Sequence, residues 1–337
     1  MNTESANLSN IVLTQRPTPL IKANRMGASI SKKLYFKRDD LLGRVLGGNK
    51  LRKLEYILPL AQKSGADTLI TTGSFESNHV CLTVAAAKML NMNAAVVLMG
   101  PKNDKRYITL NERLQKKIGA NIRLVFYDEE DAQSRSQLTQ KVDEAVAELT
   151  SELKNNGKNP YFVPGGGCCL EGTFAFVKAF EELHKQMNEY DFKSYNILLP
   201  VGTGSTFAGL WCGIKKANAS VNLYGVSIAR KNPRCVEETI KAAERVCSIL
   251  KISKPSVQQF YITDDYIGDG YGKSTELSKQ AVDNALVMEG LLLDNTYTGK
   301  ALGGMIDMVS KNIFNDKPLV FWHTGGVSGA IDNLFIL

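Results

Sequence analysis

The chain has 337 residues, of which 44% are hydrophobic and 22% charged, a composition typical of a soluble globular protein with a sizeable core. Its formal net charge of +7 is not gathered into a basic run with interleaved aromatic residues, so we expect no nucleic-acid partner. No apolar run reaches membrane-spanning length and the N-terminal segment Met1–Ser5 begins no signal peptide, so we expect no membrane association. The six cysteines form no CxxC pair and the three histidines lack metal-ligand spacing, which predicts free thiols, no metal site and a cytoplasmic location.

Strand-like and helix-like segments alternate along most of the chain. An extended segment at 33–37 is followed by apolar runs typical of strands at 68–72, 94–99, 122–126, 161–163, 197–201, 223–228, 260–263 and 319–322. Amphipathic segments of helical length separate most of them, at 80–90, 138–153, 173–187, 236–250 and 276–288. This alternation predicts an α/β protein whose parallel sheets carry helices on both faces.

The stretch from Gly47 to Lys50 is a candidate reactive site. Two glycines permit a tight turn, Asn49 is a good helix N-cap, and apolar residues recur at helical spacing from Leu51 onward. Lys50 therefore lies at the start of a predicted helix, where the helix dipole disfavours its ammonium form. A neutral lysine can form a Schiff base with an aldehyde. The alternative is a surface lysine after a turn.

Three predicted strands run directly into loops of small, hydroxyl-bearing or glycine-rich residues, at 73–79, 202–206 and 323–326. Ligands of parallel sheets bind beyond the carboxyl ends of the strands, so these loops predict one site assembled from distant parts of the chain.

The loop Gly202-Thr203-Gly204-Ser205-Thr206 predicts a phosphate site, because it combines exposed backbone N–H groups and hydroxyls with a following helix. It lacks the third glycine of a dinucleotide fingerprint and the lysine of a P-loop. The alternative is an unoccupied strand-to-helix turn.

A second polar cluster, Ser77-Asn78-His79, stands at another predicted helix start. It is suited to binding a carboxylate and a phenolic oxygen, or to simple N-capping by Ser77 or Asn78. Tyr271 and Tyr297 are aromatic residues on loops, where either packing or catalysis is open.

Taken together, these stretches resemble the fold-type II pyridoxal-phosphate enzymes, and more closely the D-cysteine desulfhydrase and 1-aminocyclopropane-1-carboxylate (ACC) deaminase family. The resemblance implies two open-sheet α/β domains, tryptophan synthase β-like, with a large domain of residues 1–53 and 166–337, a small domain of 54–165 and the cofactor between them. It also implies a homodimer. The matching stretches occur in family order at 17–20, 37–40, 47–55, 77–79, 202–206, 270–272, 297–300 and 323–326.

The resemblance also implies which residues hold pyridoxal 5'-phosphate. Lys50 would carry it as a Schiff base, Asn78 would hydrogen-bond its ring hydroxyl, and Thr324 would face the pyridine nitrogen. The phosphate would be gripped by Lys53 and by the loop residues Gly202, Thr203, Gly204, Ser205 and Thr206.

For the substrate, a small amino acid, the resemblance implies that Lys50 moves the Cα proton and that Ser77 receives the carboxylate, with Asn78 and His79 adjoining. Tyr297 would lie near the ring and the reacting carbons, with Tyr271 close by. A neutral hydroxyl at the pyridine nitrogen makes the ring a weaker electron sink and suits prompt loss of a β-leaving group.

The implied reaction is β-elimination from D-cysteine to pyruvate, ammonia and hydrogen sulfide. ACC deaminases typically carry Glu where this chain has Thr298, and tend to carry Gln where it has His79, so both positions favour the desulfhydrase. Glu76 and the pair Cys168-Cys169 depart from the family pattern and point to a possible difference in substrate. The alternatives are ACC deaminase, a related β-eliminating sulfo-lyase, and a phosphate-ligand binding protein without turnover.

Overall fold

The computed structural model describes residues 8–102, 107–129 and 131–335. Outside the described residues lie 1–7, 103–106, 130 and 336–337 of the two predicted domains. The N-terminal segment Met1–Ser5 is among them. In the described part of the chain, no helix is long and apolar enough to cross a bilayer.

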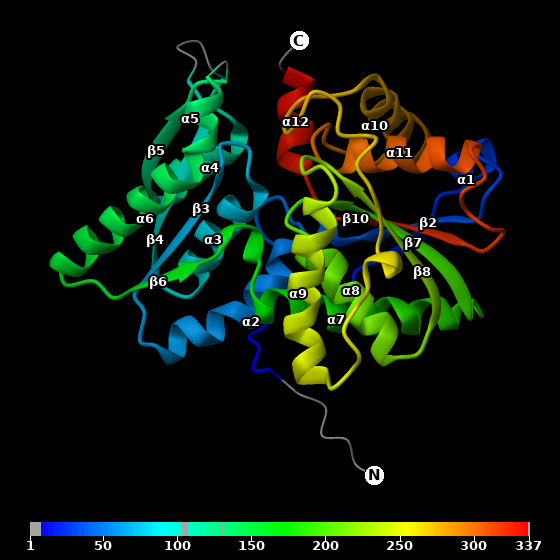
Figure 1. Ribbon diagram of the computed structural model, residues 1–337, viewed down its shortest axis with the longest axis horizontal. Coiled ribbons are helices and arrows are strands. Elements are labelled where there is room, and N and C mark those ends of the chain that lie inside the picture. Colours follow the sequence, from blue (N-terminus) through cyan, green and yellow to red (C-terminus); the bar gives the residue numbers. More distant parts are fainter. Residues whose placement is uncertain (1–7, 103–106, 130, 336–337) are drawn as a thin grey trace.

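The larger of two lobes is built on a six-stranded sheet (Figure 1). The sheet is parallel except at one edge, where β1 pairs antiparallel with β2, so the prediction of purely parallel pairing is wrong there. In spatial order the strands are β1 (Leu20–Lys22), β2 (Leu34–Arg38), β10 (Leu319–His323), β7 (Ser194–Val201), β8 (Ser220–Ser227) and β9 (Tyr261–Thr263).

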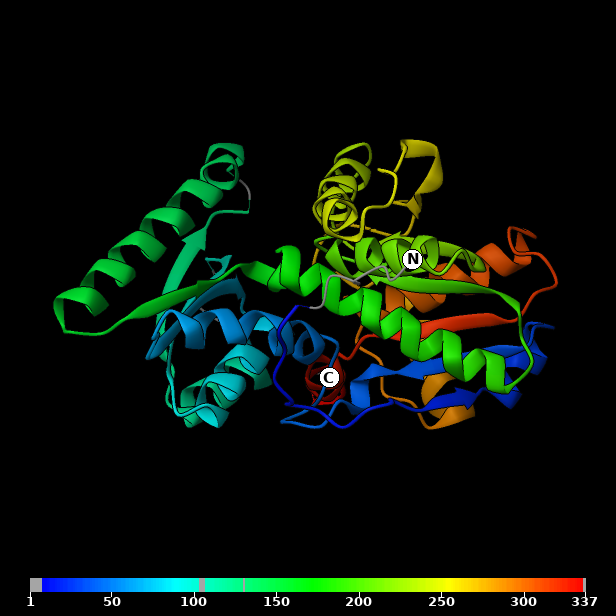
Figure 2. The same ribbon diagram turned by 90° about the horizontal axis from the view of Figure 1, so that it is seen from below.

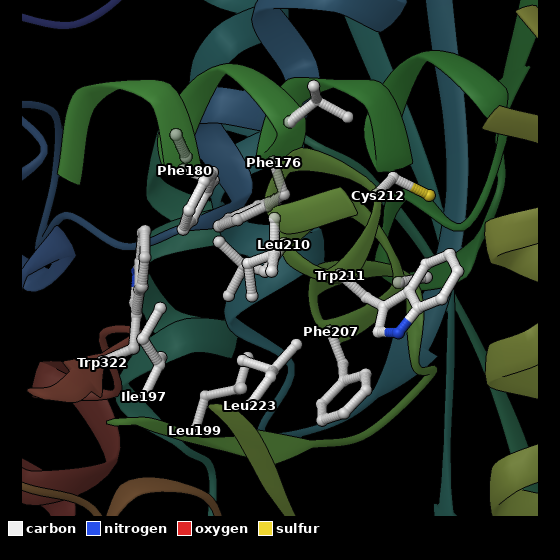
Figure 3. Close-up of a cluster of buried hydrophobic side chains, with 14 of the residues drawn as sticks. Phe176, Phe180, Ile197, Leu199, Phe207, Leu210, Trp211, Cys212, Leu223 and Trp322 are labelled. Atoms are coloured by element: carbon white, nitrogen blue, oxygen red, sulfur yellow. The ribbon is translucent and has the colours of Figure 1, made fainter. Parts of the chain in front are cut away.

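Alternating side chains of this sheet enter two separate cores, as the period of a strand requires. On β10, Val320 and Trp322 pack on one face, and Leu319 and Phe321 on the other. The first core contains side chains from α7 (Leu170–Glu189), α8 (Ser205–Lys216) and α9 (Arg234–Leu250), and is shown in Figure 3. The second contains side chains from α1 (Asn24–Ser29), α10 (Glu276–Glu289) and α11 (Thr298–Ser310). The predicted α/β class is therefore confirmed, with helices on both faces.

The smaller lobe carries a four-stranded, fully parallel sheet. Its strands are β5 (Asn121–Tyr127), β4 (Asn93–Pro101), β3 (Thr68–Ser74) and β6 (Pro160–Val163), in that spatial order. Its helices are α3 (Asn78–Met89), α4 (Leu110–Ile118), α5 (Ala132–Ser136) and α6 (Leu138–Asn155).

Two helices lie where the lobes meet: α2 (Lys50–Lys63) and the C-terminal α12 (Val327–Phe335). Figure 1 shows α12 standing between the lobes, and Figure 2 shows it nearly end-on in the same position. The apolar face of α2, which includes Leu51 and Leu54, is buried in the core of the small lobe, whereas Tyr56 packs in the core of the large lobe. The predicted helical spacing from Leu51 onward is confirmed.

A buried ionic network fixes α2 to the large lobe. Arg52 has no exposed surface and donates to both carboxylate oxygens of Asp39 at 2.8 and 2.9 Å and of Glu182 at 2.8 and 2.9 Å. The indole N–H of Trp322 donates to Asp39 at 2.8 Å. Burial alone lowers the pKa of Arg52, but the two carboxylates outweigh it and raise that pKa above its usual value. The guanidinium is thus permanently charged and fully paired.

We expect Arg52→Met to destabilise the protein by about 3–5 kcal/mol, because it leaves the buried Asp39 carboxylate without its cation. Urea unfolding of the purified protein measures this. The control is Lys241→Met, which removes an ion pair to Glu238 on the surface and should leave the unfolding midpoint within experimental error. Equal stability of the two variants would contradict a structural role for the network.

Candidate active site

The predicted loops converge on a cavity of about 410 Å³. The 73–79 loop comes from the sheet of the small lobe and the other two from the sheet of the large lobe, so the site is shared between two sheets. The predicted site residues among those lining it are Lys50, Ser77, Asn78, His79, Gly202, Thr203, Gly204, Thr206, Tyr271, Tyr297 and Thr324. Lys53 and Ser205 lie just behind this wall, bonded to each other.

The turn before α2 is held against the end of β10. The backbone N–H of Asn49 donates to the carbonyl of Thr324 at 2.8 Å. Gly48 has a φ of +128°, and a Cβ on Gly325 would lie 2.9 Å from the Cα of Gly48, so the two backbones meet at glycine contact distance. Asn49 occupies the N-cap position as predicted, but its backbone is helical and its side chain makes no cap bond; it donates instead to Thr206 Oγ1 at 3.3 Å. Its amide thus joins the start of α2 to that of α8.

The two lysines of the first turn of α2 approach the same carbonyl oxygen. Lys50 Nζ lies 3.3 Å and Lys53 Nζ 3.0 Å from the oxygen of Gly166. Burial lowers the pKa of Lys50 to about 8. Burial, and then the charge of Lys50, lower the pKa of Lys53 well below its usual value. Desolvation, rather than the helix dipole invoked from the sequence, is thus the principal cause of the lowered pKa of Lys50.

The loop after β7 forms the N-terminus of α8 and is braced by Lys53. Lys53 Nζ donates to Ser205 Oγ at 2.5 Å, and Thr203 Oγ1 lies 3.3 Å from the same hydroxyl. Gly204 is the N-cap with a φ of +86°, and a Cβ there would lie 2.2 Å from Thr239 Oγ1. The first turn of a helix carries N–H groups without intrahelical partners, so this end favours an anion.

The polar cluster at the start of α3 separates into different structural roles. Ser77 is the N-cap, and its hydroxyl accepts from the N–H of Val80 at 3.3 Å, so the capping alternative is confirmed. Asn78 Oδ1 accepts from Asn111 and from Ser328. His79 is only 3% exposed and its Nε2 lies 3.0 Å from Thr71 Oγ1, which fixes its ring beneath the cavity. Burial lowers the pKa of His79 well below its usual value, so its imidazole is neutral.

Three hydroxyls on the cavity wall form a continuous chain. The hydroxyl oxygens of Tyr271 and Tyr297 are 2.5 Å apart, and Tyr271 is also 2.9 Å from Ser74 Oγ. Burial raises the pKa of both tyrosines, which therefore carry their protons at neutral pH. Asp294 holds Tyr297 in place by accepting from its backbone N–H at 2.6 Å.

Several residues of this site were missed in the sequence. Ser74 belongs to the 73–79 loop but was not singled out, and the buried Lys300 anchors the loop of Tyr271 by donating to Ile267 and Gly270 carbonyls at 2.7 and 2.6 Å. Arg230 lines the cavity and donates to the carbonyl of Gly202 at 3.3 Å. Lys300 could have been noticed, because it directly follows the Tyr297-Thr298-Gly299 stretch. No local pattern marked Arg230.

The donor set suits an aldehyde that bears a phosphate. Among the described residues lining the cavity, none is Asp or Glu, whereas Lys50 and Arg230 are both present and Lys53 adjoins. These basic side chains and the N-terminus of α8 make the cavity favourable to an anionic ligand. A lysine with a pKa of about 8 has an amine that is suited to attack on an aldehyde. Pyridoxal phosphate meets both requirements.

Comparison with known proteins agrees with this chemistry. Residues 11–325 match the family described as "Pyridoxal-phosphate dependent enzyme". A protein of Pyrococcus abyssi named "Putative 1-aminocyclopropane-1-carboxylate deaminase" is 35% identical over 95% of this chain and 92% of its own length. A D-cysteine desulfhydrase of Salmonella paratyphi C is 33% identical over 92% of each chain.

Solved structures give the same result. The crystal structure of an ACC deaminase homologue superposes with a TM-score of 0.85 at 33% identity, covering 98% of this chain and 96% of that one. A pyridoxal 5'-phosphate-dependent aspartate racemase, 16% identical with a TM-score of 0.62, shares the fold.

The chain therefore belongs to the family of pyridoxal-phosphate dependent enzymes, with the fold-type II architecture. Within that family it is a lyase of the group that contains ACC deaminase and D-cysteine desulfhydrase, and its cofactor is pyridoxal phosphate. The family resemblance read from the sequence is confirmed, and the alternative of a binding protein without turnover is set aside.

The lowered pKa of Lys50 predicts how cofactor loading depends on pH. Only the neutral amine attacks an aldehyde, so loading of cofactor-free protein should accelerate as pH rises through about 8 and then level off, well below the pH that an ordinary lysine requires. The measurement is the rate of appearance of the cofactor absorbance band after mixing. A rate still rising steeply near pH 10 would contradict the lowered pKa, and Lys50→Ala should show no borohydride-sensitive band.

Proposed function

We propose that the protein is a D-cysteine desulfhydrase-like lyase, which converts D-cysteine and water to pyruvate, ammonia and hydrogen sulfide. The observation that carries this proposal is the placement of a proton-accepting lysine and a chain of protonated hydroxyls in one cavity without a carboxylate among its described lining residues. β-Elimination needs these two functions: a base at Cα and an acid at the leaving group.

In this proposal pyridoxal phosphate supplies the electron sink that makes the Cα–H bond acidic. Lys50 Nζ removes the Cα proton. Tyr297 donates its phenolic proton to the departing sulfur and is reprotonated through Tyr271, whose hydroxyl is 2.5 Å away. Ser77 and the backbone at the start of α3 receive the substrate carboxylate, next to Asn78 and His79.

For the cofactor, we propose that Asn78 donates to the ring oxygen and that Thr324 faces the pyridine nitrogen. Lys53 and the loop Gly202–Thr206 bind the phosphate, which is supported by the bond between Lys53 and Ser205 at the N-terminus of α8. A neutral threonine at the ring nitrogen weakens the electron sink and favours immediate loss of the β-substituent.

The second candidate is ACC deaminase, favoured by the names of the Pyrococcus relative and of the structural neighbour. The feature against it is Thr298, at the position where the resembling deaminases carry Glu. Thr298 has no exposed surface, and its hydroxyl donates to Asp294 at 2.7 Å. It is therefore engaged in holding the Tyr297 turn and adds no acid or base to the cavity.

We also propose domain boundaries at residues 53/54 and 165/166. They are supported by the sheets, since the strands of the four-stranded sheet all fall within 54–165 and those of the six-stranded sheet all fall outside it. A homodimer in the cytoplasm is proposed from the family pattern. The six free cysteines and the exposed Leu41 and Val45 on one loop support it.

The two enzymatic readings are separated by product analysis. Purified protein is supplied with D-cysteine, L-cysteine or ACC, and pyruvate, sulfide and 2-oxobutyrate are measured. We expect the highest kcat/KM for pyruvate and sulfide from D-cysteine. A higher kcat/KM for 2-oxobutyrate from ACC would overturn the proposal in favour of the deaminase.

The acid role of the tyrosine pair gives a further prediction. Tyr297→Phe should lower kcat with D-cysteine by about 10²–10⁴-fold, because it removes the proton donor while preserving the ring. The matched control is Tyr195→Phe, which removes a buried phenol bonded to His184 in the core and should leave kcat unchanged. Comparable kcat values for both variants would exclude Tyr297 as the acid.

A further inference from the structure

The side-chain amide of Asn78 is held from two different helices. Asn78 is the first residue of α3 and lines the cavity. Its Oδ1 accepts from Asn111 Nδ2 of α4 at 3.0 Å and from Ser328 Oγ of α12 at 2.7 Å. Two donors on one carbonyl oxygen leave the amide nitrogen pointing away from both.

The polarity of this arrangement follows from a backbone carbonyl. Asn111 also lies 2.9 Å from the carbonyl oxygen of Glu76, which can only accept, so the atom of Asn111 at that position is the NH₂ group. That NH₂ group also faces Asn78, whose facing atom must then be its oxygen. Ser328, which contacts the same oxygen, must donate. The two hydrogens of Asn78 Nδ2 are thus left for another acceptor.

Burial of the two partner side chains fixes the orientation of the Asn78 amide, because water cannot replace them. Asn111 is 4% exposed and Ser328 is 2% exposed, so water does not compete for either donor. Reversing the amide of Asn78 would bring its NH₂ group against the NH₂ group of Asn111, which cannot accept, so their buried hydrogen bond would be lost; only Ser328, whose hydroxyl can also accept, could adapt.

We propose that Asn111 and Ser328 are positioning residues that fix the amide of Asn78 with its NH₂ group toward the cofactor, so that the pocket accepts the ring oxygen only as a hydrogen-bond acceptor. This inference rests on the proposed contact between Asn78 and the ring oxygen. The Glu76 carbonyl orients the amide of Asn111, and Asn111 in turn orients the amide of Asn78. The pocket therefore presents a hydrogen-bond donor to the ring oxygen and selects its ionised form.

The same contacts tie cofactor binding to the seating of the C-terminal helix. Ser328 belongs to α12, whereas Asn78 and Asn111 belong to helices of the small lobe. One turn further along α12, the carboxylate of Asp332 accepts from the backbone N–H of Leu110 at 3.0 and 3.1 Å, at the start of α4. The helix therefore contacts α4 and α3 together, and Asn78 keeps its second donor only when α12 is seated.

The polarity is tested by comparing Asn78→Asp with Asn78→Ala. In Asn78→Asp, one oxygen replaces Oδ1 between Asn111 and Ser328, and the other must face the ring oxygen as a second acceptor. We expect it to bind pyridoxal phosphate about tenfold more weakly than Asn78→Ala, which merely lacks the bond. The dissociation constant is measured by absorbance titration of cofactor-free protein. Equal or tighter binding by Asn78→Asp would overturn the proposed polarity.

The positioning role is tested by a double-mutant cycle. Ser328→Ala should weaken cofactor binding about five- to tenfold and shift the absorbance maximum of the bound cofactor, but should do neither in the Asn78→Ala background. An equal effect of Ser328→Ala in both backgrounds would show a general structural role and overturn the proposal. Asn111→Ala, entered into the same cycle, gives a second route if Ser328→Ala does not fold.

The control is Ser278→Ala, which removes a hydroxyl with no exposed surface that bonds only within the N-cap of α10, and should leave both the affinity and the spectrum unchanged. Both readouts are binding and absorbance of the cofactor, so they do not depend on which amino acid is cleaved. A failure of the D-cysteine assay and a failure of this inference are therefore separate results.

Discussion

The site depends on two lysine amino groups placed one helical turn apart, on the same face of α2, without a carboxylate partner among the described residues that line the cavity. Lys50 and Lys53 both approach the carbonyl of Gly166, and no Asp or Glu is found among the described residues that line the adjoining cavity. Burial lowers the pKa of both lysines, and the charge of Lys50 lowers the pKa of Lys53 further. The nucleophilic amine of Lys50 therefore lies next to a site that favours an anionic ligand.

The first turn of α2 shows how carboxylates are distributed between structure and chemistry. Lys50, Arg52 and Lys53 lie within four consecutive positions, but only Arg52, on the other side of the helix, is paired with Asp39 and Glu182. The paired cation locks the helix to the large lobe, whereas Lys50 lines the cavity and Lys53 lies just behind its wall. A carboxylate on the ligand side would raise the pKa of Lys50 and compete with the cofactor phosphate, so its absence there is as necessary as its presence around Arg52.

Those parts of the site that rest on local chemistry were predictable from the sequence. A glycine turn before an amphipathic helix placed Lys50 at the cavity, and strands ending in hydroxyl-rich loops placed Asn78, Thr324 and the 202–206 loop there. Contacts chosen by the tertiary fold were not predictable. Asn49 has the side chain of an N-cap, yet it bonds to Thr206 because α8 begins beside it.

The antiparallel pairing of β1 and the contacts of the positioning residues could not be predicted from the sequence either. The three-residue β1 is too short to carry a periodic signal, and it pairs through its backbone. Ser328 and Asn78 are 250 positions apart, and nothing in the sequence of either marks the other as its partner. Serine and asparagine in helices are ordinary surface residues until packing buries them.

The hydrogen bonds that cross between the lobes include two that involve residues lining the cavity. Ser74 of the small lobe bonds Tyr271 of the large lobe, and Ser328 of the large lobe bonds Asn78 of the small lobe. In the mechanism that we propose, one bridge completes the hydroxyl chain to the leaving group, and the other directs the Asn78 amide toward the ring oxygen. A displacement of one lobe by about 1 Å would disturb the acid and the cofactor contact together, and misplacement of that size costs enzymes large factors in rate. Both contacts therefore depend on one relative placement of the two lobes, which their hydrogen bonds help to fix.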